Sequence, residues 1–182
     1  MTLHLSIVLF APLAFGVLGL LAPQRLAKWL ALLGSALVLG YAITLLIDFE
    51  KGAPGLQYLT DDTWIAELGI SYKLGIDGLN LVLLALTAIL WFFCTLWATQ
   101  REWDRPRLFY LHFMLAETAV LGALLAQDLA LFVAFFDLML VPFFFLTGIW
   151  SHLPRPERVA AVMKLFIYTL VGSLLMLAAA IA

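Results

Sequence analysis

The sequence has few charged residues and a single cysteine, and each shortage excludes a class of protein. Only 12% of the 182 residues are charged, whereas 65% are apolar. A typical soluble domain has about 25% charged residues, so this chain has too little polar surface to cover a water-soluble fold. With Cys94 as the one cysteine, an intrachain disulfide and a zinc or iron–sulfur site built on several cysteines are excluded. The composition therefore indicates a membrane protein.

Common catalytic and cofactor-binding motifs are also lacking. The three histidines, His4, His112 and His152, lie in separate segments and form no metal or haem pattern. The sequence contains no Gly-x-Gly-x-x-Gly motif and no phosphate-binding loop. We therefore expect no cofactor and no metal in this chain. The net charge of −2 gives no indication of nucleic-acid binding.

Six long apolar runs predict an all-α, polytopic transmembrane helix bundle. A helix needs about 20 residues to cross a bilayer, and the runs lack the alternation of a transmembrane β-barrel. They cover residues 3–21, 29–47, 79–99, 108–127, 129–150 and 159–182. We expect residues 1–78 to form two helices and an outer loop, and residues 79–182 to form four helices.

Basic residues predict the orientation of this bundle. Alternate loops contain seven of them: Arg25, Lys28, Arg101, Arg105, Arg107, Arg155 and Arg158. The loops on the other side contain only Lys51 and Lys73. Because Lys and Arg concentrate in cytoplasmic loops, the N-terminus is predicted to face outward and the seven basic residues to face the cytoplasm or its equivalent compartment.

The long outer loop contains one alternating segment. From Leu68 to Ile76 every even position is apolar, and the positions between them are polar or glycine. A period of two indicates an extended strand with one apolar face. We expect this short extended segment to lie against the helix ends or against a neighbouring subunit.

Two acids, Glu117 and Asp137, lie inside the predicted spans, whereas the other ten lie in loops or at helix ends. Counted from the predicted turn at Asp128, they lie 11 and 9 residues away, which is about 16 and about 14 Å along a helix. Both carboxyls are thus predicted near mid-membrane, where acids mark proton or ion pathways. The alternative is that each is a neutral acid hydrogen-bonded to a neighbouring helix.

Lys164 and His112 are predicted about one and a half turns inside the inner boundary. They would form the inner leg of a proton path that ends at the two acids. Alternatively, Lys164 extends to the lipid headgroups and His112 is an ordinary buried histidine. Pro142 cannot donate a hydrogen bond to the carbonyl of Leu138, which indicates either a water-binding site near Asp137 or a packing kink.

Three segments together carry a resemblance to a known family. They are residues 74–79 (LGIDGL), 128–142 (DLALFVAFFDLMLVP) and 164–173 (KLFIYTLVGS). They resemble the N-terminal part of the chain 4, or subunit M, family of proton-pumping NADH:quinone oxidoreductase, respiratory complex I. The resemblance implies an antiporter-like proton-conducting subunit with no redox centre of its own, which assembles with other membrane subunits in a bacterial plasma membrane or an organellar inner membrane. Subunits of cation/proton antiporters and membrane-bound hydrogenases, which do not oxidise NADH, share parts of these motifs and remain the alternative.

The resemblance also implies roles for individual residues. Asp137 matches the family's mid-membrane acid, which forms an ion pair with a lysine on the next helix along and gates proton transfer. Glu117 matches the acid on the preceding helix and Lys164 a lysine of helix six, whereas His112 matches no motif position. The family usually has glutamate at the position of Asp137, and aspartate reaches about 1 to 1.5 Å less far. Because the relatives continue beyond Ala182, we expect the chain to be a fragment or a split gene product, with residues 79–182 as the truncated start of the proton-translocation domain.

Overall fold

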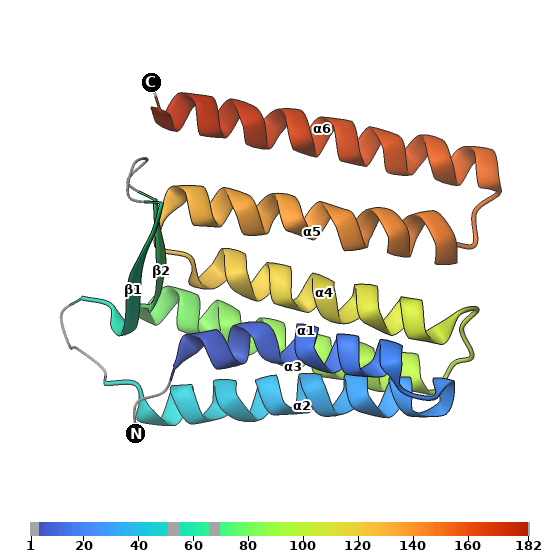
Figure 1. Ribbon diagram of the computed structural model, residues 1–182, viewed down its shortest axis with the longest axis horizontal. Helices are drawn as coiled ribbons and strands as arrows, with labels where there is room; N and C mark the ends of the chain where they lie inside the picture. The colour runs from blue at the N-terminus through green and yellow to red at the C-terminus, as the bar shows by residue number, and fades with distance from the viewer. Residues whose placement is uncertain (1–3, 51–54, 66–69, 182) are drawn as a thin grey trace.

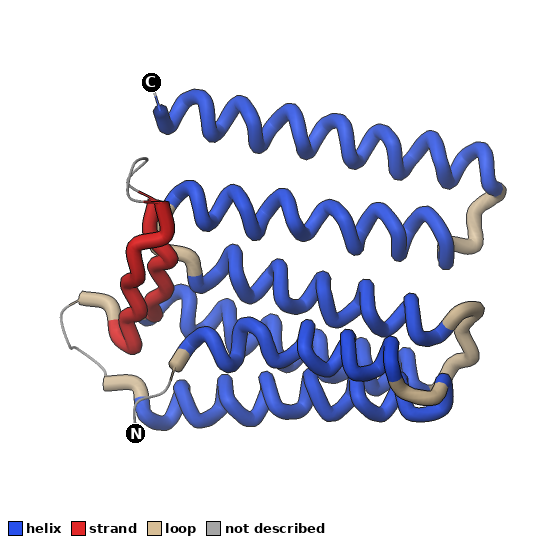
Figure 2. Tube along the Cα trace, in the orientation of Figure 1, coloured by secondary structure: helices blue, strands red, loops and turns tan. Residues whose placement is uncertain are grey.

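A computed structural model describes residues 4–50, 55–65 and 70–181. In this part of the chain six helices lie side by side and a two-stranded hairpin covers one end of the bundle (Figures 1 and 2). The elements are α1 (Leu5–Leu21), α2 (Gln24–Asp48), β1 (Gln57–Ile65), β2 (Ile70–Ile76), α3 (Gly78–Thr99), α4 (Pro106–Leu125), α5 (Leu129–Trp150) and α6 (Arg155–Ile181). The predicted fold class, a helical membrane bundle with a short extended segment, is confirmed.

Helices α1 to α4 pack against one another as a group, α5 and α6 follow in turn on one side of it (Figure 1), and the central place is taken by α4. It packs against α1 on one side and α5 on the other, and α6 packs only on α5 among the helices it contacts closely. The loops after α1, α3 and α5 lie together at one end, which we call the basic end because it holds the seven basic residues named above (Figure 1). The hairpin lies at the opposite, outer end.

Five helices, α2 to α6, are long and apolar enough to cross a membrane, and α1 is a shorter apolar helix of 17 residues. Two helices begin earlier than the apolar runs predicted: α2 begins at Gln24 rather than residue 29, and α6 at Arg155 rather than residue 159. The apolar run marks the part of a helix that is embedded in hydrocarbon. The helix itself continues into the interface, where polar helix-forming residues are favourable.

The hairpin confirms the predicted extended segment and adds a strand that was not predicted. Residues 70–76 of the expected strand form β2, while the start at Leu68 lies outside the described residues. The partner β1 runs antiparallel to it with irregular register. Its sequence shows no apolar alternation because Asp61 and Asp62 lie at its centre and the strand is largely exposed. Lys73 pairs with Asp61 at 3.0 Å across the two strands.

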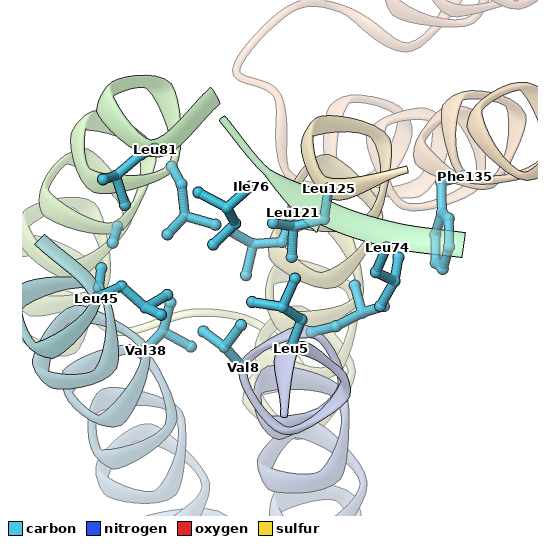
Figure 3. Close-up of a cluster of buried hydrophobic side chains, with 14 of the residues drawn as sticks. Leu5, Val8, Val38, Leu45, Leu74, Ile76, Leu81, Leu121, Leu125 and Phe135 are labelled. Carbon is cyan, nitrogen blue, oxygen red and sulfur yellow. The ribbon is translucent and has the colours of Figure 1, made fainter. Parts of the chain in front are cut away.

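β2 lies across the outer ends of the helices, so the apolar face of the hairpin packs within this chain. Leu74 and Ile76 are fully buried and join Leu5, Leu121 and Leu125 in the larger apolar core (Figure 3). Removing such a side chain from water contributes about 1.5 to 3 kcal/mol to stability. This hydrophobic contribution applies at the outer end of the bundle. The first of the two predicted locations, against the helix ends, is thus the observed one.

Polar contacts fix β2 in this position. The carbonyl oxygen of Gly75 accepts hydrogen bonds from Asn80 Nδ2 at 3.0 Å and Gln127 Nε2 at 3.2 Å. The backbone N–H of Gln127 donates to the carbonyl of Lys73, which explains why α4 ends at Leu125 and not at residue 127. Asp77 caps α3 through the backbone N–H groups of Leu79 and Asn80.

A tyrosine connects the hairpin to the end of α2. Tyr58 donates a hydrogen bond to Asp48 Oδ2 at 2.7 Å. Desolvation and this hydrogen bond to a carboxylate raise the pKa of Tyr58 to about 12. The phenol therefore remains a donor throughout the physiological pH range.

The contact between α4 and α5 gives a test of the packing. The ring of Phe135 lies where a Cβ of residue 122 would stand, so Gly122→Ala forces the helices apart. We expect a loss of about 1 to 3 kcal/mol, seen as a lower midpoint of thermal unfolding in detergent. Gly148→Ala in α5 is the matched control, because nothing lies within 4 Å of its Cβ position. Equal midpoints for the two variants would refute the close α4–α5 contact.

Candidate proton-transfer site

Glu117 is an acid enclosed in the helix bundle. Its side chain is fully buried, and neither carboxyl oxygen has a hydrogen-bond partner among the described residues. Met114 and Leu121, one turn to either side on the same face of α4, are fully buried as well. Burying a polar group without a partner is unfavourable, so Glu117 is held in place by the packing around it.

The position of Glu117 is fixed by a close contact between α1 and α4. Gly16 has no side chain, and a Cβ there would lie 2.9 Å from Met114 Cβ. Next to Glu117, Thr118 Oγ1 accepts a hydrogen bond of 3.1 Å from the backbone N–H of Leu13. These two contacts hold α4 against α1 on either side of Glu117 in the sequence. Glu117 itself lies on the face of α4 that it shares with Tyr110, seven residues earlier, whose hydroxyl donates to the carbonyl of Ala98 in α3. Its carboxyl therefore lies inside the group of helices α1 to α4.

Asp137 lies on a different helix interface. It is half-buried, and its Oδ1 is enclosed without a hydrogen-bond partner among the described residues. Phe135 faces α4 because it contacts Gly122, and Asp137, two residues further on, lies about 200° around α5. The side chain of Asp137 therefore belongs to the face of α5 that is turned away from α4.

That face of α5 is covered by α6. Phe144 of α5 packs edge-on against Phe166 of α6, with ring centroids 5.7 Å apart. Because the two helices are antiparallel, Asp137, seven residues before Phe144, lies level with Ser173, seven residues after Phe166. Ser173 is only 3% exposed. Nothing in the sequence indicated that Ser173 lies beside Asp137.

The two acids share a depth but do not face each other. Gly122 of α4 and Phe135 of α5 are in contact and therefore lie at one level. Glu117 lies five residues further inward along α4, and Asp137 lies two residues further inward along α5. The two acids therefore differ in depth by about 5 Å along the helix axes. Gly122 faces α5, and Glu117 lies about 140° from it around α4. The backbone of α4 therefore stands between the carboxyls, which open on two separate interfaces at one level of the membrane.

Lys164 and His112 are placed apart from the acids. Because α6 begins at Arg155, Lys164 lies about 14 Å along the helix from its first residue, a length that includes the part of α6 in the interface. It is exposed and lies about 200° from the buried Val162, on the face of α6 turned away from α5. No ion pair of Lys164 occurs among the described residues.

His112 lies on α4 near the basic end. Its Nδ1 is 2.8 Å from the carbonyl oxygen of Leu108, and since a carbonyl only accepts, this nitrogen carries a proton. The ring packs beside Phe145 and Trp150 of α5. Its other nitrogen, Nε2, is the one that could exchange a proton, so the ring is oriented by its own helix.

Pro142 is buried within α5, which continues on both sides of it from Leu129 to Trp150. The freed carbonyl of Leu138 therefore belongs to an unbroken helix one residue from Asp137. Among residues 4–50, 55–65 and 70–181, no group of three or more His, Cys, Asp and Glu side chains is arranged to hold a metal ion. The chemistry open to this arrangement is proton uptake and release at isolated carboxyls.

Comparisons with known proteins agree with this description. Residues 126–182 match the family described as "NADH:quinone oxidoreductase/Mrp antiporter, TM". The chain is 37% identical to NADH-quinone oxidoreductase subunit M of Rhodobacter capsulatus, over 98% of this chain and 35% of that protein. It is 34% identical to F(420)H(2) dehydrogenase subunit M of Methanosarcina mazei, over 94% of this chain and 34% of that protein.

A solved structure shows the same fold. A chain of respiratory complex I from Thermus thermophilus superimposes with a TM-score of 0.80 at 27% identity, over 97% of this chain and 35% of that chain. The chain thus spans about a third of the length of the relatives it matches. The matches and the apolar helices together establish a multi-pass integral membrane protein.

The separation of the two acids is testable by crosslinking. In a Cys94→Ser background, Asp137→Cys with Ser173→Cys is expected to be joined by a short dimaleimide, because both positions lie at the α5–α6 interface. The pair Glu117→Cys and Asp137→Cys is the control, and it is expected to stay unlinked because α4 stands between the side chains. Peptide mass spectrometry reads out both. Efficient linkage of the second pair would contradict the placement.

Proposed function

Because residues 126–182 belong to the NADH:quinone oxidoreductase/Mrp antiporter family, and nearly the whole chain is homologous to subunit M of such oxidoreductases, we propose that it forms part of a proton-translocating membrane subunit. In this proposal the chain works within a redox-driven NADH:quinone oxidoreductase and assembles with its other membrane subunits. NADH oxidation and all redox centres belong to those other subunits. The contribution of this chain is to carry protons.

One observation carries the proposal. Both carboxyl oxygens of Glu117, and Oδ1 of Asp137, are enclosed without a partner among the described residues. A charge at mid-membrane costs at least about 2.5 to 3.5 kcal/mol on insertion scales, and no described contact offsets that cost. Structural acids in a protein interior are normally hydrogen-bonded. Acids at one depth that have no fixed partner among the described residues can bind and release a proton, which supports a proton pathway.

In this proposal each acid has its own place in the pathway. Glu117 receives and releases protons inside the group of helices α1 to α4, and Asp137 does so at the interface of α5 and α6. Because α4 separates them, a proton does not pass directly from one carboxyl to the other. The two acids are instead coupled electrostatically across the helix, so that protonation of one changes the free energy of charging the other.

Lys164 and His112 have secondary roles in this proposal. Lys164 faces away from α5, so it would act through whatever element covers that side of α6. His112, with Nδ1 held by Leu108, would relay protons between the basic end and the interior through Nε2. Neither is needed for the two acids to hold protons, and both are ranked below Glu117 and Asp137.

A second function is favoured by the description of the matching family, which names the Mrp antiporter beside the oxidoreductase. An antiporter subunit without a redox partner would use the same acids. The proteins that purify with the full complex separate the two functions: flavin and iron–sulfur subunits support the redox-driven pump, and antiporter subunits alone support the second function.

We expect Asp137→Asn and Glu117→Gln to reduce redox-driven proton translocation by at least about tenfold, because an amide cannot bind and release the proton. The measurement is proton uptake per NADH oxidised in vesicles that contain the assembled complex. Glu50→Gln, an exposed acid outside the spans, is the matched control and should translocate protons normally. Subunit content, measured on the same membranes, separates loss of transport from loss of assembly.

Asp137 is one methylene shorter than the glutamate that the related subunits usually have, and this difference can be tested in the same proton-translocation experiment. Asp137→Glu restores the residue that the related subunits usually have, and it should keep or raise proton-coupled turnover. If the aspartate, glutamate and asparagine forms pump equally well with intact assembly, residue 137 does not carry protons.

A further inference from the structure

A basic cavity opens at the basic end of the bundle. It has a volume of about 330 Å³ and lies where the loop between α1 and α2 meets the loop between α3 and α4. Three cations, Arg25, Lys28 and Arg101, line it together with one carboxylate, Glu102. Among the described residues the one ion pair joins Lys73 to Asp61 at the outer end. The cavity therefore keeps an excess of positive charge that no contacting carboxylate neutralises.

Two helix N-termini add to this positive potential. Gln24 and Pro106, the first residues of α2 and α4, both line the cavity. Neither helix has a side-chain cap at its N-cap residue, Pro23 or Arg105. The positive ends of two helices of 25 and 20 residues therefore lie beside the three cations, although Pro106 itself has no N–H group to donate. The helix dipoles favour an anion at such a position.

An apolar groove adjoins the cavity on the side of the membrane interior. It has a volume of about 410 Å³ and lies between α3 and α4, with Phe93, Cys94 and Phe113 along it. Trp103 lines both the groove and the cavity. Arg101 connects them as well, because its guanidinium lies 4.2 Å from the ring centroid of Trp97, which lines the groove.

The wall shared by the two spaces is firmly held. Trp103 Nε1 donates to the carbonyl of Ala98 at 2.9 Å, and its ring stacks on Phe109 with centroids 4.0 Å apart. Tyr110, which lines the cavity, donates to the same carbonyl at 3.0 Å. The polar and apolar spaces are thus parts of one formed surface at the membrane boundary.

We propose that this surface binds an anionic phospholipid, with its phosphate in the cavity among Arg25, Lys28 and Arg101 and one acyl chain in the groove between α3 and α4. Basic pockets between transmembrane helices on the cytoplasmic side suit anionic headgroups. A soluble phosphate would occupy the cavity alone, whereas a lipid would also use the adjoining groove on the other side of Trp103. The adjoining apolar space therefore favours the lipid. The site is separate from Glu117 and Asp137, so it does not depend on the proposed proton transfer.

Native mass spectrometry of the full chain, released from nanodiscs with equal amounts of phosphatidylglycerol and phosphatidylcholine, tests this proposal. We expect phosphatidylglycerol to be retained preferentially. Each cation removed by Arg25→Gln and Arg101→Gln should lower its retention by about fivefold, since one basic residue near an anionic lipid contributes about that much. Arg155→Gln, an exposed cation at the same end but outside the cavity, is the matched control and should leave retention unchanged.

Two further arms identify the ligand and guard against misfolding. Cys94→Trp fills the groove and should lower retention of phosphatidylglycerol, while soluble glycerol phosphate should fail to displace the lipid. Arg25→Lys with Arg101→Lys keeps the charge and should restore binding, which a folding defect would not. Equal retention by the Gln variants and by Arg155→Gln overturns the site, and displacement by glycerol phosphate overturns the lipid in favour of a soluble anion.

Discussion

Hydrocarbon offers no hydrogen-bond partner to the backbone, so each long apolar segment of this chain satisfies its own N–H and C=O groups within a helix. This constraint explains why six apolar runs become six helices and why the described non-helical backbone lies at the two ends. At the outer end, the hairpin satisfies its edge through Asn80 and Gln127. At the basic end, short loops leave two helix N-termini uncapped, and that is where the cationic residues gather.

The same lack of hydrogen-bond partners in hydrocarbon explains why the two acids inside the spans indicate a function. Side chains can be hydrophobic throughout a membrane bundle, as most of these are, and a polar group among them is costly unless it has a partner. Glu117 is enclosed in the group of helices α1 to α4, where Gly16 lets α1 approach α4, and Oδ1 of Asp137 is enclosed where α6 covers α5. The bundle thus has two acidic positions at one level, separated by a helix.

The sequence predicted the helices well because a membrane span is a strong, local signal. It also predicted the strand that carries Leu74 and Ile76. It missed β1, since an exposed strand with acids at its centre carries no apolar period. It placed the starts of α2 and α6 too late, because hydropathy reports contact with lipid and not where a helix begins.

For the candidate site, the sequence predicted how deep each acid lies in the membrane but not which neighbouring helix its side chain faces. Counting residues from Asp128 placed Glu117 and Asp137 at similar levels, whereas the face of each helix depends on which neighbours it packs against. That information comes from long-range contacts such as Gly122 with Phe135 and Phe144 with Phe166. The same reason applies to Lys164, whose spacing along α6 gave no indication that it is turned away from α5.

The central claim is that Glu117 and Asp137 exchange protons while the complex works. Infrared difference spectroscopy of the assembled complex tests it most directly, because the carbonyl stretch of a protonated carboxyl is distinct from that of a carboxylate. Starting turnover with NADH should change two such bands, one of which is missing in Glu117→Gln and the other in Asp137→Asn. Identical difference spectra from the parent protein and both variants would contradict the account.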